Sequence, residues 1–113
     1  MTRIYKILPR REWEAALAPG RFEGSAVDLA DGFIHFSGAD QAVETARRYF
    51  TGQEDLFVLV VEAESLGEAL RWEPSRGGAL FPHLYGPLPC AQVIAARPAA
   101  LKPDGEPDLG ELV

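Results

Sequence analysis

The feature that most constrains the fold is the run LFVLVV at residues 56–61, in which every residue is apolar and suits a β-strand. Such a strand has no polar face, so we expect it in the middle of a sheet with both faces covered. The 113 residues match one ordinary domain, and 47% of them are hydrophobic, which suffices for a core. The sequence therefore predicts one domain over residues 1–98, followed by an acidic, proline-containing and partly ordered tail over residues 99–113.

Shorter segments on both sides of this run have strand or helix patterns of their own. β-favouring residues predict strands at residues 3–8, 33–36, 70–73, 80–84 and 92–97. Apolar residues three and four positions apart predict a helix after Pro9 and a second helix that has Ser37 as its N-cap and ends at Gly52. Residues 21–30 are expected to be irregular with one helical turn. Because these elements do not alternate strictly, we expect an α+β domain with a mainly antiparallel sheet of five or six short strands and two main helices.

Charge and cysteine content exclude several classes of protein. A net charge of −6 argues against general nucleic-acid binding, which requires a basic face. Cys90 is the only cysteine, so no internal disulfide forms, as is usual in a reducing compartment. The short, charged N-terminal segment is unlike a signal peptide, and no apolar run is long enough to span a membrane. The sequence predicts a cytoplasmic protein that does not bind membranes, with its oligomeric state left open.

Both histidines lie in short apolar and aromatic motifs that glycine or proline bounds. His35 is part of DGFIHFS, residues 31–37, and His83 is part of FPHLYGPL, residues 81–88. Imidazole changes its charge near neutral pH, so it suits proton transfer and ligand binding. We interpret His35 and His83 as candidate catalytic residues that the fold brings to one cleft.

Polar side chains close to each histidine extend this hypothesis to ligand binding. Ser37 shares a strand face with His35, and the helix expected behind it would offer N–H groups to a phosphate. Gln41, on the first turn of that helix, could reach the same ligand. Tyr85 alternates with His83 and could stack on a flat ring. The alternatives are structural: Ser37 only caps the helix, His35 is a hydrogen-bonded core residue, Gln41 faces solvent, and His83 and Tyr85 bond to the backbone.

Two other chemistries receive weaker support from the sequence. The two histidines with Glu62 or Glu73 could hold iron or zinc, but no metal-ligand spacing is present and no metal is expected. Cys90 lacks the neighbours of a catalytic nucleophile and is interpreted as a structural thiol. Glycine-rich phosphate loops and the G-x-S-x-G elbow are absent from the sequence.

Three motifs resemble those of a small, largely bacterial family, domain of unknown function 952 (DUF952). They are IYKI at residues 4–7, GFIHFS at residues 32–37 with Gln41, and FPHLYGPL at residues 81–88. The family is in turn similar to the ADP-ribosyltransferase and RNA 2′-phosphotransferase superfamily, whose split antiparallel sheet holds NAD or an ADP-ribosylated intermediate. The resemblance implies an ADP-ribosyltransferase-like fold, a nucleotide-like ligand, and NAD as the cofactor.

The same resemblance assigns roles to individual residues. His35 and His83 would be catalytic, and the ligand would contact Tyr5, Lys6, Ser37, Gln41 and Tyr85. Lys6 stands where the superfamily often has histidine, and His83 with Tyr85 replaces its usual catalytic glutamate. Ordinary transfer to a protein side chain is therefore in doubt, which favours a phosphotransferase-like role. A non-catalytic binding module and a metal-dependent enzyme that uses both histidines are the alternatives.

Overall fold

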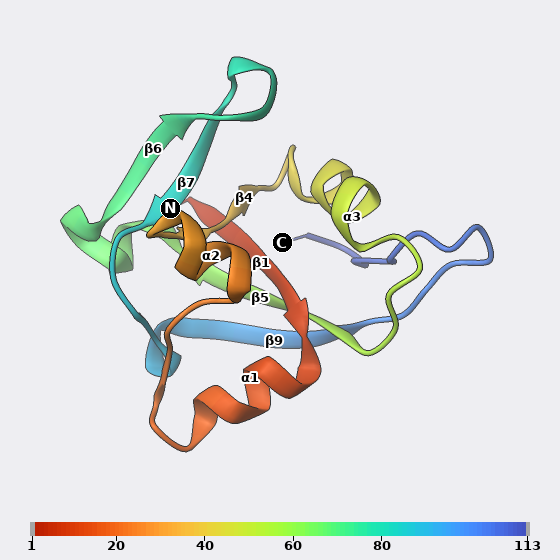
Figure 1. The fold of residues 1–113 in the computed structure, drawn as a ribbon, viewed down its shortest axis with the longest axis horizontal. Coiled ribbons are helices and arrows are strands. Elements are labelled where there is room, and N and C mark those ends of the chain that lie inside the picture. Colours follow the sequence, from red (N-terminus) through yellow and green to blue (C-terminus); the bar gives the residue numbers. More distant parts are fainter. Residues whose placement is uncertain (1, 113) are drawn as a thin grey trace.

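A four-stranded antiparallel sheet forms the centre of the computed structural model, which describes residues 2–112 (Figure 1). The strand order is β4–β1–β5–β9. The strands are β1 (Arg3–Pro9), β4 (Ser37–Gly38), β5 (Leu56–Glu62) and β9 (Val93–Ala99). Two smaller antiparallel sheets and a few helices complete the domain, so the predicted α+β class with antiparallel strands is confirmed.

Strand β5 has the central, doubly covered position that its apolar sequence predicts. It pairs with β1 from Arg3↔Glu62 to Pro9↔Leu56, and its other edge pairs with β9. Alternate residues point to opposite faces of the sheet. Leu59 and Val61 join one buried core and Val58 joins the other. The sheet is therefore the shared wall of two hydrophobic cores.

Two smaller antiparallel sheets accompany the central sheet. One has the order β3–β7–β6, with β3 (Ile34–His35), β7 (Leu80–Leu84) and β6 (Leu70–Pro74). The other pairs β2 (Arg21–Phe22) with β8 (Leu88–Pro89). Strand β2 was not predicted, because two residues are too few to show a period in the sequence.

Helices cover both faces of the central sheet. The α-helices are α1 (Arg10–Leu17), α2 (Ala26–Asp31) and α3 (Ala42–Phe50), and the 3₁₀ turns are η1 (Ala63–Ala69), η2 (Arg76–Gly78) and η3 (Cys90–Gln92). Helix α1 buries Trp13 in one core, whereas α3 buries Ala42 and Ala46 in the other. Within residues 2–112, no helix is long and apolar enough to cross a membrane.

The prediction that Ser37 caps the second long helix is wrong. Ser37 lies in β4, opposite Tyr5 of β1, and α3 begins at Ala42 with Gln41 as its N-cap. Pairing with β1 keeps the backbone of Ser37 extended, and a turn follows in which the Gln41 N–H donates to the Gly38 carbonyl at 3.0 Å. The helix N-terminus is thereby displaced from Ser37, so the expected anion site immediately behind Ser37 does not form.

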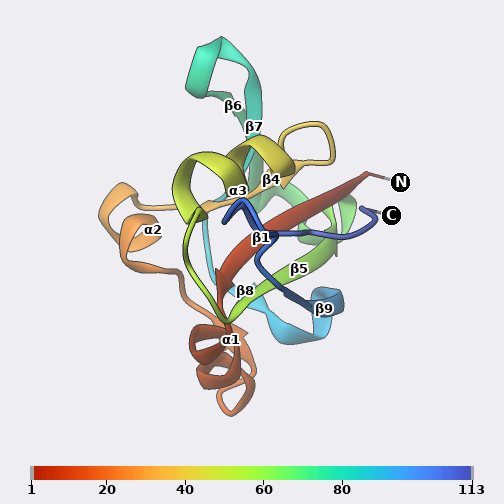
Figure 2. The ribbon, with the colours of Figure 1, turned by 90° about the vertical axis from the view of Figure 1, so that its right-hand side faces the viewer.

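The C-terminal segment after β9 folds back beside α3 (Figure 2). A bridge joins Leu101 to Pro107, and the Gly52 N–H donates to the Gly105 carbonyl at 2.8 Å. Leu109 is buried in the core that also contains Ala46. Residues 100–109 therefore contribute packing to the domain.

Candidate functional site

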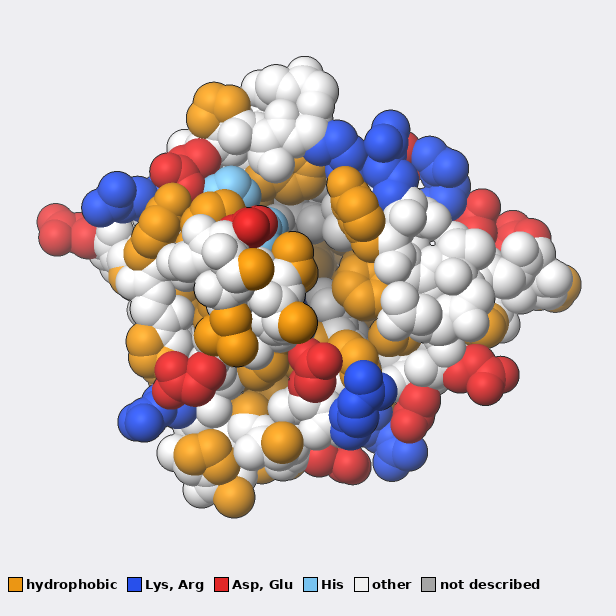
Figure 3. Space-filling view, in the orientation of Figure 1, with side chains coloured by type: hydrophobic (Ala, Val, Ile, Leu, Met, Phe, Trp, Pro, Cys, Tyr) orange, Lys and Arg blue, Asp and Glu red, His pale blue; other side chains and the backbone are white. Residues whose placement is uncertain are grey.

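A cleft of about 630 Å³ opens between α2 and α3, beside β1 and the end of β7. Figure 3 shows it as a hollow bordered by hydrophobic side chains, with histidine at its edge. Five of the seven side chains predicted for the site line this cleft, namely Tyr5, Lys6, His35, Ser37 and His83. The fold thus gathers residues from three distant parts of the chain into one concavity.

The two histidines meet because their strands are neighbours in the smaller sheet. His35 of β3 is the direct partner of His83 in β7, and their ring centroids are 5.7 Å apart. Phe33 stacks on His83, with centroids 4.1 Å apart and planes 24° from parallel. It also contacts the ring of His35 at 4.6 Å. This aromatic contact limits the orientations open to both imidazoles.

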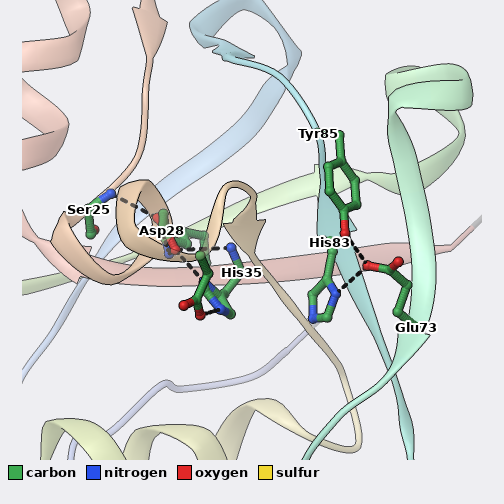
Figure 4. Close-up of polar contacts among 8 residues, drawn as sticks. Ser25, Asp28, His35, Glu73, His83 and Tyr85 are labelled. Atoms are coloured by element: carbon green, nitrogen blue, oxygen red, sulfur yellow. Dashed lines mark hydrogen bonds and ion pairs between the residues drawn. The ribbon is translucent and has the colours of Figure 1, made fainter.

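A carboxylate orients the ring of His83. Its Nδ1 lies 2.8 Å from Oε1 of Glu73, and the Tyr85 hydroxyl donates to the same oxygen at 2.8 Å (Figure 4). These two bonds, with a smaller contribution from Arg71, hold the pKa of Glu73 below its usual value. An ionised carboxylate only accepts, so Nδ1 carries a proton, and in the neutral form of the ring Nε2 would hold the lone pair. Residues 2–112 offer that Nε2 no hydrogen-bond partner.

His35 differs from His83 because both of its ring nitrogens are occupied. Nδ1 lies 2.6 Å from Oδ1 of Asp28, and Nε2 lies 2.9 Å from Oδ2 of Asp31. Both partners are acceptors, so only the doubly protonated imidazolium makes both bonds. His35 therefore has no free ring nitrogen to offer a ligand, because two carboxylates occupy both of them.

Asp28 is the centre of a buried charge network. Its carboxylate accepts from Lys6 Nζ at 2.8 and 3.0 Å, from the Ser25 N–H at 2.8 Å and from the His35 N–H at 3.1 Å. Burial by itself raises the pKa of Asp28, but the bonds from His35 and Lys6 outweigh it and bring that pKa to about 2. Burial lowers the pKa of Lys6, and Asp28 opposes that change. The network fixes α2 against β1 and β3.

Sequence reasoning missed Asp28 as part of the site, although a signal was present. Ser25-x-x-Asp28 forms a capping box at the start of α2, in which each side chain bonds to the other residue's backbone. Lys6, which interrupts the apolar pattern of β1, gave the second half of the signal. A cation in a buried strand requires a buried anion nearby.

A family model described as "Protein of unknown function (DUF952)" matches residues 7–96 of the chain. The chain belongs to the DUF952 family. The crystal structure of protein CC0527 from Caulobacter crescentus is similar, with 62% identity over 96% of each chain and a TM-score of 0.94. The solution NMR structure of the same protein is 63% identical over 97% of this chain and 95% of that chain, with a TM-score of 0.88. No curated protein matches the sequence.

Two predicted ligand residues of this DUF952 protein lie outside the cleft lining. Gln41 accepts from the Gly38 N–H at 2.9 Å and donates to the Leu80 carbonyl at 2.8 Å, so it joins the turn after β4 to β7. Tyr85 is 39% exposed, and the Arg71 guanidinium lies 5.0 Å from its ring centre. Both residues support the site from outside.

Tyr5 lines the cleft but is only 2% exposed and packs in the core beneath α3. Its ring has little surface on which a base could stack. The aromatic side chain of the cleft lining with most exposed surface is instead Tyr49 of α3, which is 60% exposed and was not predicted as a site residue.

Metal and thiol chemistry find little basis in the described residues of this DUF952 protein. Between residues 2 and 112, no group of three or more histidine, cysteine or acidic side chains is arranged to hold a metal ion. Cys90 lies outside the cleft lining, and its thiol donates to the Ala16 carbonyl with a sulfur–oxygen distance of 3.4 Å. Burial raises the pKa of the Cys90 thiol, which disfavours the reactive thiolate.

Proposed function

We propose that this protein binds a nucleotide-like small molecule, such as NAD or ADP-ribose, and that His83 exchanges a proton with it. The observation that carries the proposal is the state of the two ring nitrogens of His83. Glu73 holds Nδ1 at 2.8 Å, while Nε2 has no partner among residues 2–112 and the side chain lines the cleft. A fixed imidazole with one unoccupied nitrogen in a pocket has the geometry of a general base.

The carboxylate of Glu73 supports proton transfer by His83, because a carboxylate hydrogen-bonded to an imidazole helps that ring to accept a proton. When Nε2 takes a proton, the ring becomes an imidazolium, and the adjacent carboxylate stabilises that charge. Glu73 keeps its negative charge because the bonds from His83 and Tyr85 depress its pKa.

The size and walls of the cleft support a nucleotide-like ligand. Its volume of about 630 Å³ falls in the range of small-molecule sites, about 300–1,000 Å³. Aromatic and apolar side chains form much of the lining, with a few polar groups among them. This combination suits a flat base attached to a polar sugar and phosphate.

Resemblance to the ADP-ribosyl and 2′-phosphotransferase superfamily suggests the class of reaction. The acidic side chains that line the cleft are Glu12 and Asp31. Ser25 Oγ donates to Glu12 at 2.6 Å, and Asp31 bonds to His35. Because both carboxylates are engaged, neither is free to act as the catalytic glutamate that is usual in that superfamily. This favours a phosphotransferase-like step that uses His83.

The test is a titration of isotopically labelled protein with NAD and with ADP-ribose, followed through the ring signals of both histidines. In the wild-type protein we expect saturable shifts of the His83 ring signals. In His83→Gln we expect normal folding but loss of turnover of NAD or ADP-ribose. Absence of any shift at His83 with millimolar ligand would reject the nucleotide proposal.

A non-catalytic binding module is the second candidate, and the occupied carboxylates of the cleft favour it. In that case His83→Gln would keep the ligand affinity within about twofold, a change of roughly 0.4 kcal/mol. The wild-type protein would also leave NAD and ADP-ribose chemically unchanged by mass spectrometry after prolonged incubation.

A further inference from the structure

We infer that Arg76, Thr45 and Ser37 form a subsite for a phosphate group of the ligand, an inference that rests on the proposed function. The three side chains come from the β6–β7 connection, from α3 and from β4, and all of them line the cleft. The sequence analysis linked Ser37 to a phosphate, but it did not point to Thr45 or Arg76.

Arg76 is a cation that aromatic rings hold in place. Its guanidinium carbon lies 5.0 Å from the ring centre of Phe81 and 5.9 Å from that of Tyr49. No carboxylate of residues 2–112 lies within ion-pair distance of it. By contrast, Arg47 and Arg48 on the neighbouring helix both pair with Glu44. Arg76 therefore keeps its full charge available to a ligand.

The contact that Arg76 does make is weak and easily exchanged. Nη1 and Nη2 each lie 3.4 Å from Oγ1 of Thr45, at the long end of hydrogen-bond distances. A phosphate oxygen would accept shorter, charge-assisted bonds from the same planar guanidinium. Ligand binding would thus replace two poor bonds with two good ones.

Thr45 and Ser37 extend the donor set beyond the arginine. Ser37 Oγ and Thr45 Oγ1 are 3.0 Å apart, and either hydroxyl can donate. Ser37, Thr45 and Arg76, which come from three elements of the fold, thus form one connected set of hydrogen-bonding groups in the cleft lining. Tetrahedral phosphate accepts from several directions at once, whereas a planar carboxylate suits a single guanidinium fork.

Arg76 differs from the other cations that line the cleft. The chain has a net charge of −6, and the buried cation Lys6 is neutralised by Asp28 at 2.8 Å. Blue side chains above and below the hollow in Figure 3 show that Lys and Arg border the cleft. Arg11 also lines it without a carboxylate partner, but no hydroxyl of residues 2–112 bonds to Arg11. Among the cations of residues 2–112 that line the cleft, only Arg76 combines an unpaired charge with adjacent hydroxyl groups.

The experiment measures the affinity of four probes at one fixed ionic strength: pyrophosphate, adenosine 5′-diphosphate, adenosine and succinate. We expect Arg76→Gln to weaken pyrophosphate and the diphosphate by about tenfold or more, as for lost charged hydrogen bonds. Adenosine should be unaffected. Thr45→Val, which keeps the side-chain shape, should weaken both phosphates by a few-fold.

Arg71→Gln is the matched control for the charge change. Arg71 also lies 5.0 Å from an aromatic ring, that of Tyr85, and belongs to the adjacent strand β6, but it does not line the cleft. Arg71→Gln removes the same charge as Arg76→Gln, but from a residue outside the cleft lining. It should therefore change phosphate affinity by less than about twofold. Equal losses in Arg71→Gln and Arg76→Gln would overturn the subsite and leave only a diffuse electrostatic effect.

The outcomes separate this inference from the proposed function. If pyrophosphate binds through Arg76 but His83 signals respond to no nucleotide, the subsite stands and the proposed function falls. If the diphosphate binds equally well to wild type and Arg76→Gln, the subsite falls and nucleotide binding stands. Succinate binding as tight as that of pyrophosphate would overturn the assignment to phosphate.

Discussion

The buried pair of Lys6 and Asp28 gives the sharpest quantitative prediction. The structure lowers the pKa of Asp28 from 3.8 to about 2, nearly two pKa units. At about 1.36 kcal/mol per unit, the ionised carboxylate contributes about 2.4 kcal/mol to stability. Asp28→Asn removes that contribution and leaves Lys6, only 5% exposed, without its counter-ion. Breaking a buried pair costs about 3–5 kcal/mol. We expect Asp28→Asn to lower the free energy of unfolding by about 3 kcal/mol, at the low end of this range, because Lys6 can lose its proton and so avoid being a buried, unpaired charge.

The assay is urea denaturation followed by fluorescence of Trp13, which is buried in the core that borders the pair. A lower midpoint with an unchanged slope would show that the native state alone has lost stability. We expect Lys6→Met combined with Asp28→Asn to be less destabilised than the two single changes would add up to, because no buried charge is then unpaired.

The exposed pair of Arg10 and Asp55 is the matched control. Asp55 accepts from Arg10 at 2.7 and 2.9 Å, as Asp28 does from Lys6, but both side chains are largely exposed. Asp55 has a φ of +63°, which asparagine also tolerates, so Asp55→Asn adds no backbone strain. It should leave the free energy of unfolding nearly unchanged. If both variants lose similar stability, or Asp28→Asn loses less than about 1 kcal/mol, burial does not govern the pair.

Four further predictions follow from individual contacts. The folded-state pKa of Asp28 is depressed, so its contribution is present above pH 3.8 and is lost as the pH falls toward about 2; Asp28→Asn should show a flatter stability profile in acid denaturation. His83→Gln should raise the pKa of Glu73 toward its ordinary value of 4.5, and an unchanged carboxyl titration by ¹³C NMR would contradict the observed bond. Gly24→Ala should cost about 1–3 kcal/mol in urea denaturation, because φ is +124° and a Cβ would lie 2.9 Å from that of Asp28. Leu109→Ala should cost about 2–3 kcal/mol in the same assay, whereas no effect would show that the C-terminal segment packs only weakly.

Much of the fold follows from local patterns in the sequence. The apolar run at residues 56–61 predicted β5, and the β-favouring residues around Lys6 and His83 predicted β1 and β7. Such patterns predict elements because the spacing of apolar residues along a strand or helix follows the face that is buried. The family resemblance, seen in three short motifs, is confirmed by the match over residues 7–96.

The site was predictable only in part, because its partners lie far apart in the chain. Both histidines were recognised from their motifs, but their carboxylate partners were not. Asp28 reaches His35 through the capping turn of α2, and Glu73 reaches His83 from the paired strand β6. No spacing rule in the sequence connects residues that meet through strand pairing.

The sequence by itself determined the positions of the longer strands, β1, β5, β6, β7 and β9, and the α+β class of the domain. Tertiary structure decided that His35 faces His83 across β3 and β7, and that α3 begins at Ala42 because Ser37 pairs with β1. The physical reason is that burial and backbone preference act along the chain, whereas the register of strand pairing is set by all of the packed elements together.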